Sequence, residues 1–255
     1  MPAAPLTCDA YLGGRLALWQ PAEGYRAGID PVLLAAACPA RSGESVLELG
    51  CGTGTASLCL AARVADLALT GIERQPEVAA LARRNAAENR IPMTVIEADL
   101  AHLPAGLRQG SFDHVIANPP YFRRDISYPS HHAAREAAMG EETPLATWVD
   151  VAARRLVPGG WFTLIQRPER LDGILGALRD LGSVQIQPLA PRAGRDAKLI
   201  LLRARKGGKA ALRLHAPLIL HEGQTHERDG DDYTDGLTSV LRGGMALPGF
   251  GAAPI

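Results

Sequence analysis

The chain has 255 residues, and 47% of them are hydrophobic, enough to bury the core of one large α/β domain. Its 27 lysine and arginine residues are balanced by 27 aspartate and glutamate residues, so the net charge is zero. This balance excludes long-range steering of a polyanion by the whole chain, and such a partner would need a local basic patch.

Cysteine and histidine spacing gives no metal signature. The four cysteines form no C-x-x-C pair, and the histidines show no ligand-like spacing beyond the adjacent His131 and His132, so no metal is expected. No apolar run reaches the length of a membrane span, and no signal peptide is recognised. We therefore expect a protein of the reducing cytoplasm.

Residues 1–40 are expected to form a hairpin and a short helix. Residues 16–20 alternate weakly between apolar and polar side chains, which predicts a short strand or hairpin. Asp30 followed by Pro31 is typical of a helix start, with the aspartate as N-cap and the proline at the first helical position. A helix should therefore cover residues 32–37, with Asp30 acting either as its cap or in a functional site.

The segment Val46–Gly54, V-L-E-L-G-C-G-T-G, organises the interpretation of the whole chain. Residues 46–49 indicate a buried strand, and the alanine- and leucine-rich residues 55–64 indicate a helix. The three glycines between them let the backbone approach a ligand, and the helix N-terminus offers unpaired N–H groups. The pattern predicts a nucleotide cradle, although a tight strand–helix turn would use the same glycines. Its spacing differs from that of dinucleotide sites, and Glu48 precedes the first glycine.

Three further strands are predicted downstream, over residues 67–72, 93–97 and 112–117, with a helix over 76–89. Alternating strands and helices favour a parallel sheet, which binds ligands at the carboxyl ends of its strands. Polar residues follow these three strands and are candidates for that site: Glu73, Asp99 and Asn118. A plain surface position is the alternative for Glu73.

Asn118-Pro119-Pro120-Tyr121 is the most specific signal in the sequence. The two prolines end a strand and stiffen the loop that projects from the sheet. The side-chain oxygen of Asn118 and the carbonyl of Pro119 can each accept one N–H of a planar amine, which holds its nitrogen in line with an electrophile. Tyr121 offers a face on which a flat substrate can stack. A simple β-turn is the alternative, which the position downstream of the glycine loop disfavours.

The second half of the chain is expected to complete the sheet. The predicted elements are a helix over 145–156, a strand over 161–166, a helix over 171–178, and an antiparallel strand pair over 184–189 and 198–204. Beyond residue 205 we expect a tail with one strand-like run, 212–220, followed by an acidic and flexible stretch.

A long loop is predicted over residues 122–142, and loops of this length are usually functional. Basic residues in this loop and in the distal turn suit contacts with the phosphates of a nucleic acid, although a solvated charge run is the alternative. They are Arg123, Arg124, Arg135, Arg192, Arg195 and Lys198.

The glycine loop and the N-P-P-Y turn resemble those of the class I S-adenosylmethionine (SAM) methyltransferases that modify planar amines. The opening segment, with Gly24-Tyr25-Arg26 and Gly28-Ile29-Asp30-Pro31, is similar to that of the bacterial tRNA1(Val) adenine-37 N6-methyltransferase family. The resemblance implies a Rossmann-like domain over 41–205, with a seven-stranded, mostly parallel sheet and an antiparallel final strand. It also implies SAM as methyl donor, an adenine of a tRNA anticodon loop as substrate, and no metal.

The resemblance assigns roles to individual residues. The glycine loop would lie against the methionine part of SAM, Glu73 would bond the ribose hydroxyls, and Asp99 would accept the adenine amino group. The N-terminal segment would cover the methionine end, and Asn118–Tyr121 would be catalytic, with Tyr121 also contacting RNA. The expected cofactor-binding residues are Tyr25, Arg26, Gly28, Asp30, Glu48, Leu49, Gly50, Cys51, Gly52, Thr53, Gly54, Glu73, Arg74, Asp99, Leu100 and Asn118.

Three functions are compatible with the sequence, and an RNA adenine N6-methyltransferase is favoured. A protein glutamine methyltransferase would also grip a planar amide with N-P-P-Y. Such enzymes usually carry a separate N-terminal helical domain, whereas about forty residues precede the glycine loop here. A SAM-binding module without catalysis is the third function, and the intact N-P-P-Y turn argues against it.

Overall fold

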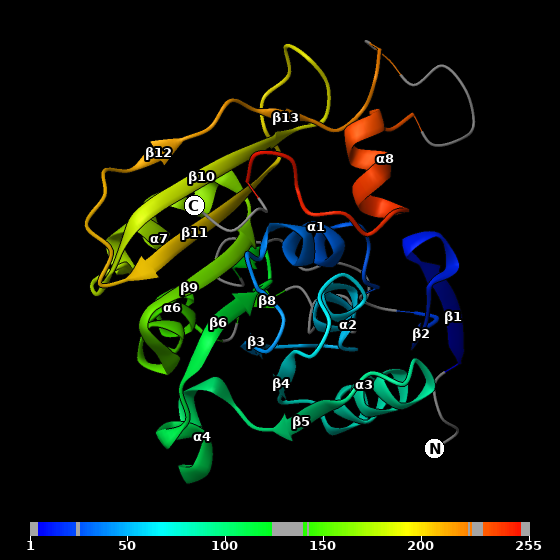
Figure 1. Cartoon of the computed structure of the whole chain (residues 1–255), viewed down its shortest axis with the longest axis vertical. Helices are drawn as coiled ribbons and strands as arrows, with labels where there is room; N and C mark the ends of the chain where they lie inside the picture. Colours follow the sequence, from blue (N-terminus) through cyan, green and yellow to red (C-terminus); the bar gives the residue numbers. More distant parts are fainter. Residues whose placement is uncertain are drawn as a thin grey trace.

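A mostly parallel sheet forms the centre of the computed structural model, which describes residues 5–23, 26–123, 140–141, 143–223, 225 and 232–250 (Figure 1). Its strands are β3 (Ser45–Leu49), β4 (Ala68–Glu73), β5 (Met93–Glu97), β6 (Phe112–Ala117), β9 (Leu156–Gln166), β10 (Leu181–Ala190), β11 (Leu199–Lys206), β12 (Arg213–Leu214) and β13 (Leu218–Ile219). The order is β12-β10-β11-β9-β6-β3-β4-β5, and β13 also pairs with β10.

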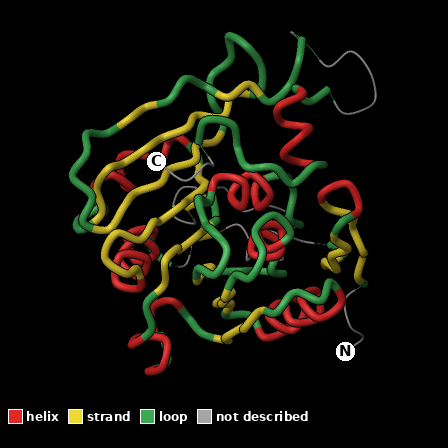
Figure 2. Tube along the Cα trace, in the orientation of Figure 1, coloured by secondary structure: helices red, strands yellow, loops and turns green. Residues whose placement is uncertain are grey.

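One strand of this sheet runs against the others. β11 is antiparallel to both β9 and β10, while the remaining neighbours pair in parallel. The seven strands from β10 to β5 therefore confirm the predicted Rossmann-like fold, with its antiparallel final strand. β12 and β13 are short additions along the outer edge of β10, where residues 207–223 run mostly as loop (Figure 2).

Helices cover both faces of the sheet because its strands are apolar on both faces, as parallel strands usually are. Val46 packs in one cluster with the helices of the first face, whereas Leu47 and Leu49 pack in a second cluster with those of the other. The first face carries α1 (Asp30–Ala37), α2 (Thr55–Ala61), α3 (Pro76–Glu88) and α8 (Asp235–Leu241). The second carries α4 (Ala105–Gln109), α6 (Leu145–Arg155) and α7 (Leu171–Ala177).

Short elements complete the described chain. They are the hairpin strands β1 (Leu6–Tyr11) and β2 (Leu16–Pro21), the two-residue strands β7 (Phe122–Arg123) and β8 (Gly140–Glu141), and the 3₁₀ turns Leu12–Gly14, Leu100–His102 and Pro168–Arg170. None of the described helices combines the length and apolar character that crossing a membrane requires.

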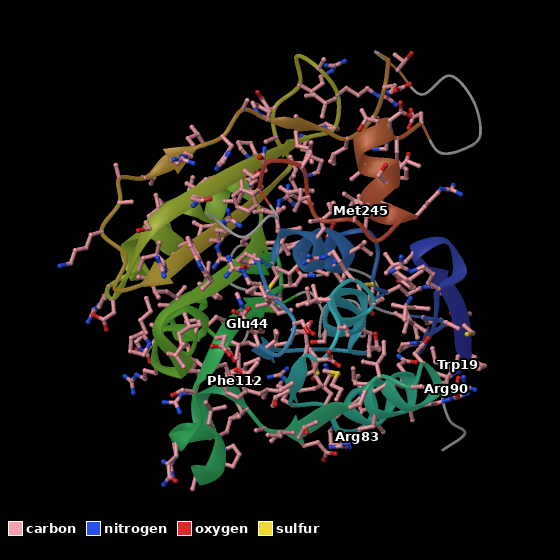
Figure 3. All side chains as sticks on the ribbon, viewed as in Figure 1. Trp19, Glu44, Arg83, Arg90, Phe112 and Met245 are labelled. Atoms are coloured by element: carbon pink, nitrogen blue, oxygen red, sulfur yellow. The ribbon has the colours of Figure 1, made fainter. Side chains whose placement is uncertain are left out.

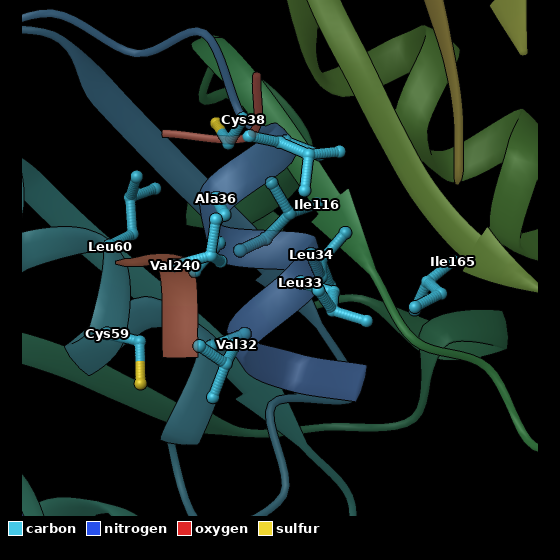
Figure 4. Packing of buried hydrophobic residues seen from close by; sticks show 14 of the residues in the cluster. Val32, Leu33, Leu34, Ala36, Cys38, Cys59, Leu60, Ile116, Ile165 and Val240 are labelled. Carbon is cyan, nitrogen blue, oxygen red and sulfur yellow. The ribbon is translucent and has the colours of Figure 1, made fainter. Parts of the chain in front are cut away.

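Helix α1 is the most completely enclosed helix of the first face. Residues 31–37 are all buried, so the helix has no solvated side. Leu33 and Leu34 lie close to Ile116 and Ile165 of the sheet, with Cys59 of α2 and Val240 of α8 nearby (Figure 4). A helix that is apolar all round needs cover on every side.

The C-terminal segment supplies part of that cover, and here the sequence-based prediction of a flexible tail is wrong for the described residues. Leu237 of α8 and Phe250 are fully buried, and the Leu247 amide donates to the Ala36 carbonyl at 2.9 Å. Leu237, Val240 and Leu241 have helical spacing, but this run is too short to predict a buried helix by periodicity alone, and polar residues and glycines surround it. Residues 226–231 of the predicted acidic stretch lie outside the described part of the chain.

The N-terminal hairpin is present as predicted, and it docks on α3 through two asparagines. Asn85 accepts the Trp19 amide at 2.7 Å and donates to the Trp19 carbonyl at 3.1 Å. Asn89 forms the same pair of bonds with Ala17, at 3.0 and 2.9 Å. These side chains satisfy the edge of β2 as a neighbouring strand would, and Figure 3 shows Trp19 at the end of α3.

An ion pair between a buried histidine and a half-buried glutamate lies at the amino end of the sheet. The Nε2 atom of His114 in β6 is 2.7 Å from Oε2 of Glu44, and the histidine side chain is almost fully buried. Burial lowers the pKa of His114, but hydrogen bonding and charge from Cys38 and Glu44 outweigh it and raise this pKa to about 9.

We expect the contribution of His114 to the free energy of unfolding to fall by about 1–2 kcal/mol between pH 6 and pH 8. The folded pKa of His114 lies above the unfolded value, so its contribution is complete below about pH 6.5 and is lost as the pH rises toward about 9. Urea unfolding across this range measures how the free energy of unfolding changes with pH. The range lies below the pKa at which the cysteines of the unfolded chain titrate. His114→Gln should remove this part of the decline and leave the part that comes from the buried Glu48, whose pKa is raised to about 7 and which titrates over the same range. An unchanged slope would show that His114 does not contribute.

Candidate active site

The carboxyl ends of the parallel strands meet at one edge of the sheet. Leu49 at the end of β3 pairs with Ile72 of β4 and with Ala117 of β6, and Ala117 pairs in turn with Leu164 of β9. At the other side, Glu73 pairs with Glu97 of β5. The glycine loop, the residues after β4 and β5, and the N-P-P-Y turn therefore emerge at the same edge, as expected for an open α/β site.

The glycine loop needs its glycines for two different reasons. Gly50 and Gly52 have φ angles of 60° and 55°, a region that residues with side chains rarely adopt. At Gly50 a Cβ atom would lie 2.5 Å from the ring of Trp148, so the backbone there is in close contact with α6. At Gly52 a Cβ atom would meet nothing within 4 Å, so the loop faces open space where a ligand can approach the backbone.

Glu48 supports this loop from beneath. Its Oε2 accepts the backbone N–H of Ser57 at 3.0 Å and the Ser57 hydroxyl at 2.5 Å, which ties β3 to the first turn of α2. Burial raises the pKa of Glu48 to about 7, against the opposing effect of the Ser57 hydrogen bonds and with a further contribution from Glu73. Because the carboxyl is buried and partnered in this way, we propose a supporting role rather than direct cofactor contact.

Glu73 holds the loop from the neighbouring strand. Its Oε2 accepts the Gly52 amide at 3.0 Å, and its Oε1 accepts the Gln75 amide at 2.9 Å. A carboxylate has about four acceptor positions, so Glu73 retains capacity for two hydroxyl groups. The structure thus brings Glu73, the residue predicted to bind the ribose, into contact with the glycine loop.

Asp99 and Leu100 lie after β5 at the same edge. The Asp99 carboxylate accepts the Ala101 amide at 2.8 Å and so caps a short 3₁₀ turn, leaving its other oxygen without a partner in the described chain. Leu100 is buried in the cluster of the second face. Arg74 follows Glu73 directly and makes contacts of its own.

Asp30 corrects one prediction from the sequence. It begins α1, but Ile29 is the N-cap and no side chain caps this helix. Instead, the Asp30 carboxylate accepts the Tyr121 hydroxyl at 2.6 Å. Burial raises the pKa of Asp30, and the bond from Tyr121 opposes that rise. The aspartate that the sequence assigned to the cofactor cover therefore contacts the N-P-P-Y turn.

Asn118 is half-buried, and its side-chain amide has no hydrogen-bond partner within the described residues. Pro119 is buried, and its carbonyl accepts the side-chain amide of Gln166 at 3.2 Å. The two predicted acceptors, the Asn118 side chain and the Pro119 carbonyl, thus lie on consecutive residues of a turn that prolines stiffen.

The loop before α1 is fixed by the N-terminal hairpin. Gln20 is buried and accepts the Ala27 amide at 2.7 Å, and the Tyr11 hydroxyl donates to the Ala27 carbonyl at 2.5 Å. Arg26 pairs with Asp9 at 2.7 Å, so this predicted cofactor residue is engaged by β1. A Cβ atom at Gly28 would meet nothing within 4 Å, while Tyr25 lies outside the described residues.

The predicted phosphate contacts separate into three groups. Arg124 and Arg135 lie outside the described residues, and for Arg123 only the place of its backbone in β7 is described. Arg192 pairs with Asp232 and donates to the Glu222 carbonyl, so the C-terminal segment already balances its charge. The other two, Arg195 and Lys198, are exposed in the turn between β10 and β11.

Comparisons with known proteins connect this geometry to a family. A family model described as a methyltransferase domain matches residues 46–160. A tRNA1(Val) (adenine(37)-N6)-methyltransferase from Aeromonas hydrophila is 32% identical over 189 residues, covering 71% of this chain and 77% of the relative. The chain belongs to the class I SAM-dependent methyltransferases.

Two further relatives of this methyltransferase cover much of its length. A Porphyromonas gingivalis protein, also named tRNA1(Val) (adenine(37)-N6)-methyltransferase, is 33% identical over 175 residues, covering 65% of this chain and 68% of the relative. A crystal structure from Agrobacterium tumefaciens, described as a predicted O-methyltransferase, is 30% identical. It superimposes with a TM-score of 0.70 over 89% of this chain and all of that one.

The methyltransferase uses SAM, which supplies a methyl group on a positively charged sulfur. The site suits this cofactor for two reasons. The space beside Gly52 is open because glycine has no side chain to fill it, and the Glu73 carboxylate can accept further hydrogen bonds. We propose that Glu73 binds the ribose hydroxyls and Asp99 the adenine amino group. In the described part of the chain, no three His, Cys, Asp or Glu residues gather in a way that could hold a metal.

Three buried polar residues of the methyltransferase escaped prediction as site residues: Gln20, Asn85 and Gln166. Asn85 donates to the Thr53 carbonyl at 2.9 Å and so holds the glycine loop as well as the hairpin. A usable signal exists for two of them. Asn85 is a polar residue on the face of α3 that is otherwise buried through alanines, and Gln166 ends a buried strand at the ligand-binding edge.

Glu73→Gln should weaken the binding of S-adenosylhomocysteine by about 1.5–3 kcal/mol, because a charged acceptor is lost. Glu73 also holds Gly52, so loosening of the loop must be separated from loss of the ribose contact. Calorimetry with the 2′,3′-dideoxy analogue makes the separation, since this ligand should lose little additional affinity in the variant. Equal losses for both ligands would contradict the ribose assignment.

Proposed function

We propose that the protein transfers the methyl group of SAM to N6 of an adenine in a tRNA anticodon loop, and that this reaction takes place in the cytoplasm. The observation that carries this proposal is the Asn118 side chain, half-buried and without a partner in the described residues, beside the Pro119 carbonyl. Two neighbouring acceptors match the two N–H groups of a primary aromatic amine. The names of the Aeromonas and Porphyromonas relatives support adenine in tRNA as the acceptor.

The geometry suggests how the turn activates a poor nucleophile. The lone pair of an exocyclic amine is delocalised into its ring, and two hydrogen bonds to its N–H groups hold the nitrogen in the orientation for attack. As this nitrogen bonds to the methyl carbon, the bond from that carbon to the sulfur of SAM would break, and a proton would then leave the nitrogen. Positive charge would develop on the nitrogen in this step, which would strengthen both of its hydrogen bonds to the turn. Hydrogen bonds to charged groups contribute roughly 1.5–3 kcal/mol each.

Tyr121 supports recognition of a flat base. Its hydroxyl donates to Asp30, which lies on the enclosed helix α1, so the ring is anchored at its far end. A base in an anticodon loop is already partly unstacked, and turning it into a pocket costs only a few kcal/mol. Stacking on an aromatic ring returns roughly 1–3 kcal/mol per base.

Phosphate contacts would come from the basic residues near the carboxyl ends of the parallel strands. β10 ends and β11 begins at the turn that carries Arg195 and Lys198, and both side chains are exposed there. The residues predicted in the loop after the N-P-P-Y turn remain part of the proposal, namely Arg123, Arg124 and Arg135. We leave out Arg192 because Asp232 already pairs with it.

Asn118→Ala should lower kcat about 10–100-fold, because one acceptor that acts chiefly in the transition state is removed. The affinity for SAM should stay close to that of the parent, since the substitution leaves the glycine loop and Glu73 intact. Single-turnover kinetics with saturating tRNA and calorimetry with SAM measure the two quantities. Asn118→Asp keeps side-chain oxygens as acceptors and should retain more activity than the alanine variant. Near-normal turnover by Asn118→Ala would contradict the mechanism.

The acceptor is identified by incubating the enzyme and tritiated SAM with total tRNA, and separately with cell protein, from a strain that lacks this gene. We expect label in tRNA, recovered as N6-methyladenosine after digestion to nucleosides. Label only in protein would overturn the RNA assignment in favour of a glutamine side chain. Absence of label in both fractions would indicate a SAM-binding module without catalysis.

A further inference from the structure

Gln166 lies beneath the N-P-P-Y turn. It is the last residue of β9, and its side chain has no exposed surface. Leu164 pairs with Ala117, so Gln166, two positions on, reaches Pro119, two positions beyond Ala117. Its Nε2 donates to the Pro119 carbonyl at 3.2 Å and is 3.5 Å from the Pro120 carbonyl.

Building on the proposed function, we propose that Gln166 is a positioning residue that aims the Pro119 carbonyl at the acceptor amine. Gln166 does not touch the substrate in this proposal, and it acts only through the carbonyl that does. The comparison of Gln166 with a matched buried glutamine elsewhere in the sheet makes the proposal testable.

The proline rings alone do not aim this carbonyl. A proline ring fixes φ, whereas the direction of the following carbonyl depends on ψ. The next proline narrows ψ of Pro119 but still allows a range of about 40°. A productive site holds its groups within roughly 10–20°. Neither Pro119 nor Pro120 has an N–H group, so the turn lacks two donors that would ordinarily help to fix its own carbonyls.

The Gln166 amide is itself held in one orientation. Its Oε1 accepts the Arg167 amide at 2.9 Å, so a flipped side chain would place its NH₂ group against a backbone N–H. The donor end must therefore face the Pro119 carbonyl. A carbonyl oxygen has two lone pairs, so the bond from Gln166 leaves the second one for an N–H of the substrate.

A matched control is present in the same sheet. Gln187 of β10 is also buried, and its Nε2 donates to the Pro188 carbonyl at 3.1 Å and to the Ala216 carbonyl at 2.7 Å. β11 separates this strand from β9. Gln187→Met and Gln166→Met remove the same donor from the same kind of partner, but only Gln166 contacts the N-P-P-Y turn.

We expect Gln166→Met to lower kcat about 10–100-fold, because small misplacements of a reacting group cost up to about 100-fold in rate. Its Kd for SAM and KM for tRNA should stay within about twofold of the parent values. Gln187→Met should keep kcat within about twofold, even where both variants lose similar thermal stability. Parental kcat in Gln166→Met, or an equal loss of kcat in Gln187→Met, would overturn the proposal.

Gln166→Glu provides a second readout that a purely structural role would not move. A protonated carboxyl can donate to the Pro119 carbonyl and accept the Arg167 amide, as glutamine does, whereas the carboxylate only accepts. The ratio of kcat in Gln166→Glu to kcat in the parent should therefore fall as the pH rises through the titration of the new carboxyl. If the kcat ratio of Gln166→Glu is independent of pH and no higher than the kcat ratio of Gln166→Met to the parent, positioning through the bond to the Pro119 carbonyl is contradicted.

These tests separate the inference from the proposed substrate. If the enzyme labels protein instead of tRNA, the same variants are assayed with that acceptor, because a glutamine amide also presents two N–H groups. Label in protein but not in tRNA would overturn only the proposed substrate. Normal turnover by Gln166→Met on the acceptor that is labelled would overturn only the positioning role of Gln166.

Discussion

The left-handed backbone of the glycine loop is the constraint on which the rest of the site depends. Gly50 and Gly52 adopt their conformations because they lack side chains, so the loop has few groups of its own with which to hold that shape. Its support comes from three buried polar side chains on other elements: Glu48 bonds the start of α2, Glu73 bonds the Gly52 amide, and Asn85 bonds the Thr53 carbonyl. Burying such groups is costly unless they are hydrogen-bonded, and here each one is.

The N-P-P-Y turn is also held by side chains from other elements. Proline removes backbone donors as glycine removes side chains, so the turn also relies on partners from outside. Asp30 reaches it from α1, and Gln166 reaches it from β9. The strand order places β6 between β3 and β9, which puts the two loops and their supports at adjacent positions along one edge.

Most of the sheet was predictable because its strands are short apolar runs that end in glycine, acid or proline signals. The supports were harder to predict because each depends on a partner far away in the sequence. Asn85 bonds Trp19 across 66 positions, and Gln166 bonds Pro119 across 47. Periodicity indicates which face of an element is buried, but it does not show which backbone group a buried amide will meet.

The C-terminal segment shows the same limit on a larger scale. Its one periodic run, Leu237 to Leu241, is short, and the other buried residues follow no period, so the sequence indicated a flexible tail. The informative feature lay in α1, where residues 31–37 are apolar on every side and require more cover than the sheet and α2 provide. The need for a further layer could therefore be inferred from α1, although the segment that supplies it could not.

This arrangement has a consequence for biosynthesis. Ala36 and Leu247, which share a backbone hydrogen bond, are about 210 residues apart, so at roughly 5–20 residues per second α1 waits tens of seconds for its partner. During that interval one apolar side of the helix remains exposed on the nascent chain, a surface on which a chaperone can act. Asp30 sits at the start of this helix and anchors Tyr121, so the acceptor platform stands on a helix whose cover is completed only when residues 235–250 have been made.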